Sequence, residues 1–225
     1  MIPFQSIYPS SLGYVMRQTS SLTRHEAFGL TWIVGRGARC EIWLPLNTFS
    51  ADTPGELANH LAKYEHVDRF IGMLEGAKAS NSRVIDLNQM MLIVKAVANG
   101  FLKLIDRAGF NANAIHAKVI LGSVWRVTPF VDSKIMLDRS EKYGLPLCLS
   151  EEVMMPSGDD ADSFHEISLS KFPDVGPSYH SCAFLIFELV CRGLGLQGMI
   201  TGGSAEEAAK LYDELKDAWL RASEE

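Results

Sequence analysis

The sequence lacks a long apolar run. The apolar run over residues 183–187 is ended by Glu188, whereas a membrane-spanning helix needs about 20 apolar residues in succession. The first 24 residues contain neither a charged start nor a continuous apolar stretch, so no secretory signal is predicted. The 4 cysteines lie far apart without a CxxC pair, a pattern typical of reduced thiols. These absences predict a cytoplasmic protein with no membrane partner.

Basic residues are also too few for a protein whose whole surface binds nucleic acid. The chain has 21 Lys and Arg against 27 Asp and Glu, a formal net charge of −6, although a local basic patch stays compatible with this balance. Glycine and proline, 18 and 9 residues without a period, are too sparse for a collagen-like or low-complexity chain. With 47% hydrophobic residues over 225 positions, the composition predicts a globular protein that buries a core.

Dense catalytic and metal-binding motifs are absent as well. His165-Glu166 does not continue as HExxH, residues 176–180 do not form GxSxG, and Gly202-Gly203-Ser204 lacks the lysine of a phosphate-binding loop. The 6 histidines share no metal-ligand spacing; His60 and His66 fit a partly buried helix surface. The sequence therefore assigns no catalytic residue, metal or cofactor. This favours a non-enzymatic protein, although an active site assembled from distant residues would leave no such motif.

The first half of the chain predicts a hairpin followed by two long central helices. Residues 28–34 and 40–46 are rich in β-forming residues and are joined by a short connection that contains glycine, which predicts an N-terminal β-hairpin. Thr53-Pro54-Gly55-Glu56 has the spacing of a capping box and begins a helical stripe that reaches residue 76. The second helix is expected over residues 87–107, capped by Asp86 or Asn88.

The second half of the chain mixes shorter elements with two further helices. We expect a bent strand over 117–130, a short helix over 133–143, strands over 145–155 and 164–169, and a C-terminal helix pair over 181–192 and from Ser204 onward. Because strands and helices are partly segregated, a mixed or antiparallel sheet and an α+β fold are predicted. Residues 1–24 are expected to be an irregular N-terminal arm, and residues 25–225 a single α+β domain.

Arginine is concentrated near the N-terminus. The first 50 residues contain 4 arginines, no lysine and 2 acids, whereas residues 151–174 contain 7 acids and a single lysine. The planar guanidinium suits phosphate and carboxylate recognition. The tip of the predicted hairpin is therefore a candidate contact for nucleic acid or for the acidic loop of a second subunit, and a solvated turn is the alternative. The candidate binding residues are Arg17, Arg24, Arg36 and Arg39.

Aromatic and turn residues in the second half carry a resemblance to a known family. The runs are Val124-Trp125-Arg126-Val127-Thr128-Pro129-Phe130-Val131-Asp132, Tyr143-Gly144-Leu145-Pro146, Met155-Pro156-Ser157-Gly158 and Ser163-Phe164. Residues 116–195 thereby resemble the region that follows the AlbA-like (Schlafen-type) DNA-binding domain in some bacterial proteins. The resemblance implies a bacterial protein in a nucleic-acid or defence-related context. It carries over no functional residue, because the AlbA-like domain's own start and Gly-Gly segment are missing here.

Two function hypotheses follow from these observations. The first is a non-enzymatic bacterial binding or accessory module that contacts nucleic acid or a like subunit. The second is an enzyme, a hydrolase or transferase, whose cleft is built from scattered residues. A homo-oligomer is a further expectation, because Leu215 and Trp219 lie one turn apart on the last predicted helix and are large enough to anchor an interface. The alternative for Trp219 is that it closes the protein's own core.

Overall fold

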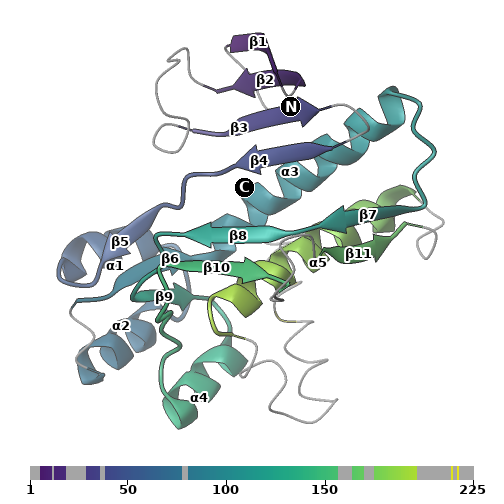
Figure 1. Ribbon diagram of the computed structural model, residues 1–225. Helices are drawn as coiled ribbons and strands as arrows, with labels where there is room; N and C mark the ends of the chain where they lie inside the picture. The colour runs from purple at the N-terminus through teal and green to yellow at the C-terminus, as the bar shows by residue number, and fades with distance from the viewer. Residues whose placement is uncertain are drawn as a thin grey trace. The chain divides into compact units, whose positions relative to one another are not determined.

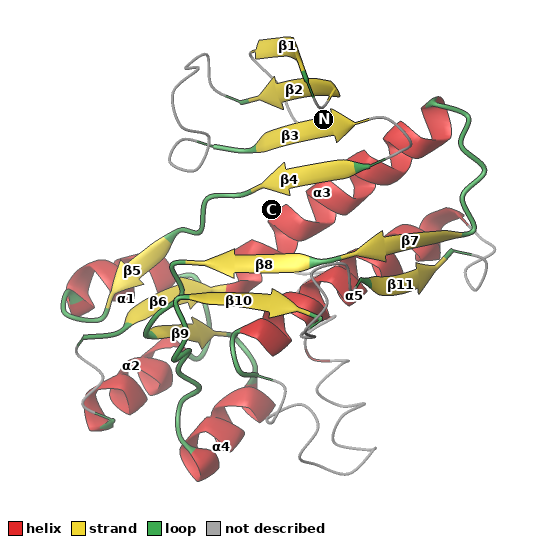
Figure 2. Cartoon of the chain, in the orientation of Figure 1, coloured by secondary structure: helices red, strands yellow, loops and turns green. Residues whose placement is uncertain are grey.

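The computed structural model describes residues 6–11, 13–18, 29–35, 39–77, 81–156, 164–169, 175–196, 214 and 217. The chain divides into two compact units, Met1–Asn47 with Ala96–Ala112 and Thr48–Lys95 with Asn113–Glu225. Helices and strands are partly segregated along the chain (Figures 1 and 2), which confirms the predicted α+β class. The single domain over residues 25–225 stays a prediction. Among the described residues, no helix combines the length and the apolar content needed to cross a membrane.

The first unit contains a four-stranded antiparallel sheet in the order β1-β2-β3-β4. Its strands are β1 (Ser6–Ser10), β2 (Gly13–Arg17), β3 (Thr31–Gly35) and β4 (Cys40–Trp43). The predicted N-terminal hairpin is confirmed as β3 and β4, and the Gly35 N–H donates to the Arg39 carbonyl at 2.8 Å to close it. The helix α3 (Leu87–Arg107) begins in the second unit and supplies its later residues to the first.

The irregular arm expected over residues 1–24 is wrong for residues 6–10 and 13–17. These residues form β1 and β2, and β2 pairs with β3 so that Val15 lies opposite Ile33. Gly13 makes the hairpin possible, because its φ of 140° and the nearby Val34 carbonyl leave no room for a side chain. The sequence prediction failed because the pairing with β3, rather than a local apolar pattern, satisfies the backbone of this segment.

The second unit is built on a mixed sheet in the order β5-β6-β9. The strands β5 (Thr48–Ser50) and β6 (Arg83–Asp86) are antiparallel, whereas β6 and β9 (Val127–Phe130) are parallel. The helices α1 (Pro54–Leu61), α2 (Val67–Gly76) and α4 (Lys134–Tyr143) contribute to its core. That core consists of Leu57, Leu61, Phe70, Leu74, Val84, Phe130 and Leu137.

The structure divides the first predicted long helix into α1 and α2. The separation falls at residues 62–66, where the backbone N–H groups of Glu65 and His66 donate to the Asp132 carboxylate at 3.3 and 3.1 Å. Asp132 thus binds N–H groups at the start of α2, which a continuous helix would have bonded internally. Arg69 then ties α2 to α4 through Asp138 and Glu141, at 2.6 and 2.7 Å.

The remaining strands form two two-stranded sheets, β8 with β10 and β7 with β11, which follow one another in Figure 1 and which we together call the ribbon. One side consists of β7 (Ala114–Ala117) and β8 (Val119–Gly122), and the other of β10 (Glu152–Met155) and β11 (His165–Ser168). Both pairings are antiparallel. The bend predicted between residues 117 and 130 lies before β9, where Ser123 and Arg126 adopt positive φ values of 55° and 56°.

The ribbon packs against α5 (Val175–Gly193), the first helix of the predicted C-terminal pair. Leu121, Val153 and Met155 lie next to Gly193 of α5 and therefore form the inner face of the ribbon. The second helix of the pair is described only at Glu214 and Asp217, which are both helical. Leu215, Trp219 and the acidic loop at residues 159–162 lie outside the described residues.

Candidate functional site

Titratable side chains gather at the carboxyl ends of two parallel strands in the second unit. Asp86 is the last residue of β6, and Asp132 follows the last residue of β9 by two positions. Because β6 and β9 are parallel neighbours, these two residues come to the same edge of the sheet. The carboxyl edge of parallel strands is where ligands bind in open α/β sheets.

Asp86 is almost completely buried, with 1% of its side chain exposed. Its Oδ1 accepts hydrogen bonds from the backbone N–H groups of Asn88 and Gln89 at 3.0 and 3.1 Å, so it caps α3. This confirms one of the two caps predicted from the sequence. These contacts satisfy N–H groups that the first turn of α3 leaves without an intrahelical partner.

Tyr64 and His60 reach the other oxygen of the same carboxylate. The Tyr64 hydroxyl donates to Asp86 Oδ2 at 2.8 Å. Burial raises the pKa of Tyr64 well above its ordinary value, and the negative charge of Asp86 raises it further. His60 Nε2 lies 3.4 Å from the same oxygen without the alignment of a hydrogen bond, and its ring stacks on Phe49 with centroids 3.9 Å apart. Tyr64 therefore stays protonated as a donor.

Asp132 holds a second imidazole. His66 Nδ1 lies 2.9 Å from Asp132 Oδ1, and the side chains are 25% and 13% exposed respectively. This contact favours the tautomer that carries its proton on Nδ1, which leaves Nε2 as the basic nitrogen. Asn88 links the Asp86 carboxylate to the backbone of Asp132, since its Nδ2 donates to Asp86 Oδ1 and its Oδ1 accepts from the Asp132 N–H, both at 3.2 Å.

A third carboxylate, that of Glu214, lies at the start of α4. It accepts from the Ser133 hydroxyl and from the Ile135 N–H, the latter at 3.2 Å. Asp86, Asp132 and Glu214 thus each bind backbone N–H groups at the beginning of a helix. These carboxylates are occupied in holding α2, α3 and α4, whereas the imidazoles of His60 and His66 are groups of the cluster whose chemistry suits proton transfer.

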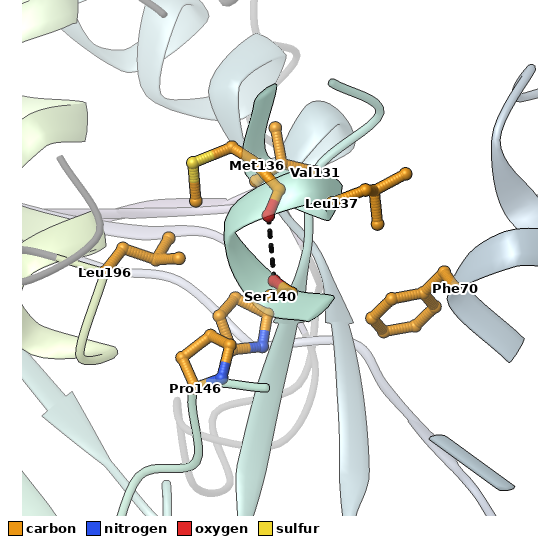
Figure 3. A pocket seen from close by; sticks show the side chains of 8 residues that line it. Phe70, Val131, Met136, Leu137, Ser140, Pro146 and Leu196 are labelled. Atoms are coloured by element: carbon orange, nitrogen blue, oxygen red, sulfur yellow. Dashed lines mark hydrogen bonds between the residues drawn. The ribbon is translucent and has the colours of Figure 1, made fainter. Parts of the chain in front are cut away.

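A cavity lined by residues of α2, β9 and α4 is too small for a substrate. It measures about 10 Å³, close to the least volume that holds one water molecule. Apolar side chains dominate its lining, and Figure 3 shows the Ser140 hydroxyl directed at the Met136 carbonyl of its own helix, to which it donates at 2.9 Å. Within the described part of the chain, no group of three or more His, Cys, Asp or Glu residues is arranged to hold a metal ion.

A second feature of this unit is an exposed apolar surface on the ribbon. Ile120 of β8 lies directly opposite Met154 of β10, and they are 56% and 42% exposed. Phe164, just before β11, is 50% exposed. We call this surface the outer ribbon face; it consists of Lys118, Ile120, Gly122, Glu152, Met154 and Phe164. It lies on the side opposite to the inner residues that pack on α5.

The predicted arginine patch is only partly within the described structure. Arg39 is exposed beside the β3–β4 connection. Arg17 is 4% exposed, because it lies on a central strand of the sheet opposite Thr31, and it is therefore not part of an exposed patch. Arg24 and Arg36 lie outside the described residues. Of the four arginines, the described residues include Arg17 and Arg39 alone, so the patch stays a prediction centred on Arg36 and Arg39.

Neither the cluster around Asp86 and Asp132 nor the outer ribbon face was identified from the sequence as a site. Asp86 and Asp132 each follow a short apolar run, residues 84–85 and 130–131, and this pattern of an acid after a strand was the available signal. The pairing of His66 with Asp132 had no such signal, because 66 positions separate the two residues. The register of β8 and β10 likewise joins residues that are distant in the sequence.

Comparison with known proteins found no match: no family model, no curated protein and no solved structure is similar to this chain. The resemblance of residues 116–195 to the region after the AlbA-like domain therefore stays a prediction.

Proposed function

We propose that the protein is a non-enzymatic binding module that contacts a partner protein through the outer ribbon face. The observation that carries the proposal is the exposed pair of Ile120 and Met154, which face each other across two strands. The ribbon buries its inner residues against α5, with Leu121 only 5% exposed. The ribbon is thus packed on one side and leaves apolar side chains in solvent on the other.

Contiguous exposed apolar groups on a sheet face are characteristic of interaction sites. Isolated exposed apolar residues are common, but neighbouring ones rimmed by charges mark surfaces that another molecule covers. Here Ile120 and Met154 form the centre, and Phe164 extends it beside Lys118, whose Nζ lies 5.8 Å from the ring centroid. Large apolar anchors surrounded by charged residues are the usual composition of a protein–protein contact.

The charges around this face favour a protein over a nucleic acid. Glu152 belongs to the face itself, and Glu151 and Glu166 lie exposed at its two ends. These carboxylates would repel phosphates, whereas nucleic-acid surfaces gather Lys and Arg. The nucleic-acid hypothesis depends instead on Arg36 and Arg39 of the hairpin.

A second candidate function, a hydrolase or transferase, is favoured by the pair of His66 and Asp132. A carboxylate that accepts the Nδ1 proton of histidine orients the ring and prepares Nε2 to act as a general base. The 2.9 Å contact and the partial exposure of His66 fit that role.

Native mass spectrometry of the protein purified from its host tests the proposed binding role. The wild type is expected to retain a bound protein, either a second copy or another chain. Ile120→Glu should lose it, because a charge in the apolar centre must be desolvated on binding. Tyr143→Glu is the matched control, since Tyr143 is 66% exposed on α4, away from the ribbon. Retention of the same partner by Ile120→Glu would refute the proposal.

A further inference from the structure

Met154 lies exposed at the centre of the outer ribbon face. It is 42% exposed and stands directly opposite Ile120 in the pairing of β8 with β10. The other methionines among the described residues are less exposed. Those that are buried, at 4–5% exposure, are Met90, Met91 and Met136, and those that are half-buried are Met16, Met73 and Met155. Within the described part of the chain, Met154 is therefore the methionine that a reagent in water reaches most easily.

The neighbouring residue Met155 provides an internal comparison. Successive side chains of a strand point to opposite faces of the sheet, so the ribbon itself separates Met154 from Met155. A Cβ added at Gly193 of α5 would lie 3.5 Å from Cγ of Met155, which places Met155 on the inner face. Two methionines joined by one peptide bond thus differ in exposure because of the pairing and packing of β10.

An exposed methionine reacts with peroxides. The sulfur of the thioether attacks one oxygen of hydrogen peroxide with a lone pair, so that an S–O bond forms and the O–O bond breaks. The proton of the new S–OH group passes to the departing hydroxide, which leaves as water. The sulfur is oxidised to a sulfoxide and the peroxide is reduced; methionine sulfoxide reductases reverse the change. The side chain is thereby converted from an apolar group into a polar one whose oxygen binds water.

We infer that Met154 is an oxidation site through which peroxide prevents binding at the outer ribbon face. The inference rests on the proposed function, because it describes the regulation of the same surface. A partner that covers Ile120 must also cover Met154, since the Cβ atoms of directly opposed residues lie about 5 Å apart. Covering a sulfoxide removes water from its oxygen without replacing the hydrogen bonds, which should weaken binding about tenfold or more.

Peptide mapping by mass spectrometry, after a short exposure of the full chain to hydrogen peroxide, tests the site. In the folded protein Met154 is expected to gain oxygen about tenfold faster than the buried methionines, and faster than Met155, because susceptibility follows exposure. In urea the rates should converge, since unfolding exposes every thioether. Oxidation of Met154 no faster than that of Met155 in the folded protein would overturn the inference.

The dye anilinonaphthalene sulfonate, which fluoresces on exposed apolar surface, measures the effect on the face. Ile120→Glu defines the share of the fluorescence that the outer ribbon face contributes. Peroxide should remove about the same share from the wild type, and methionine sulfoxide reductase should restore it. Met154→Leu keeps an apolar side chain of similar volume and should retain the dye after peroxide, whereas Met155→Leu, the matched control, should lose it as the wild type does. Circular dichroism verifies the fold of every variant.

Native mass spectrometry of the protein purified from its host separates this inference from the proposed function. The oxidised wild type and Ile120→Glu should both lose the bound protein, and oxidised Met154→Leu should keep it. If Ile120→Glu loses the bound protein while the oxidised wild type keeps it, the inference fails and the proposed function stands. If Ile120→Glu keeps it, both fail.

Discussion

The substitution Gly100→Ala in α3 is expected to destabilise the protein, although alanine usually stabilises a helix relative to glycine. In an open helix interior, replacing glycine by alanine stabilises by about 1 kcal/mol, because alanine loses less backbone entropy on folding. At Gly100, however, an added Cβ would lie 2.8 Å from Cη2 and 3.3 Å from Cζ2 of Trp32. Carbon atoms normally approach to about 3.5–4.0 Å, and Trp32 is 3% exposed.

The buried Trp32 side chain cannot move away from an added methyl group without disturbing its neighbours in the first unit. Overpacking a core by one methyl group costs roughly 1–3 kcal/mol, which exceeds the gain from helix propensity. Gly100→Ala should therefore lower the free energy of unfolding by about 1–2 kcal/mol. Gly72→Ala in α2 is the control of opposite sign, since nothing lies within 4 Å of its added Cβ, and it should stabilise by about 0.5–1 kcal/mol.

Equilibrium unfolding in urea, followed by circular dichroism and by tryptophan fluorescence, measures both variants. In a Trp32→Phe background the smaller ring removes the clash, so the cost of Gly100→Ala should disappear. Equal stabilisation by Gly100→Ala and Gly72→Ala would refute the packing of α3 on the sheet of the first unit.

Two further predictions follow from the perturbed titrations. Burial and Asp86 raise the pKa of Tyr64 above its ordinary 10.0. The contribution of Tyr64 to stability is therefore complete below about pH 10 and is lost as the pH rises further. The free energy of unfolding of the wild type should fall more steeply above pH 10 than that of Tyr64→Phe. Burial also raises the pKa of Cys182 to about 11, and burial together with Glu41 raises that of Cys40 to about 11. At pH 8 both thiols should react slowly with a disulfide reagent, and all 4 cysteines, which are free, should react once urea unfolds the chain. A native disulfide, found as a mass change on reduction, would contradict this.

Local signals in the sequence were sufficient to predict the elements whose stabilising contacts join residues close together in the chain. The short helix α4 follows Ser133, whose hydroxyl accepts from the Met136 N–H, and it ends before Gly144, whose φ is 93°. The β3–β4 hairpin follows in the same way from β-forming runs around a short connection. Such features could be predicted because their stabilising contacts lie close together in the chain.

Tertiary contacts decided the features that local patterns left open. The stripe from residue 54 to residue 76 suits one helix, but the Asp132 carboxylate binds the N–H groups of Glu65 and His66 and begins a new helix there. Arg17 looked like a surface cation, yet the pairing of β2 between β1 and β3 buries it.

The candidate sites depend on tertiary structure most of all. The parallel pairing of β6 with β9 brings Asp86 and Asp132 to one edge, and the register of β8 with β10 places Ile120 opposite Met154. The amino-acid types at these positions limit the chemistry to carboxylates, imidazoles and apolar side chains. Their proximity was not encoded locally, because strand register depends on which faces are buried across the whole sheet.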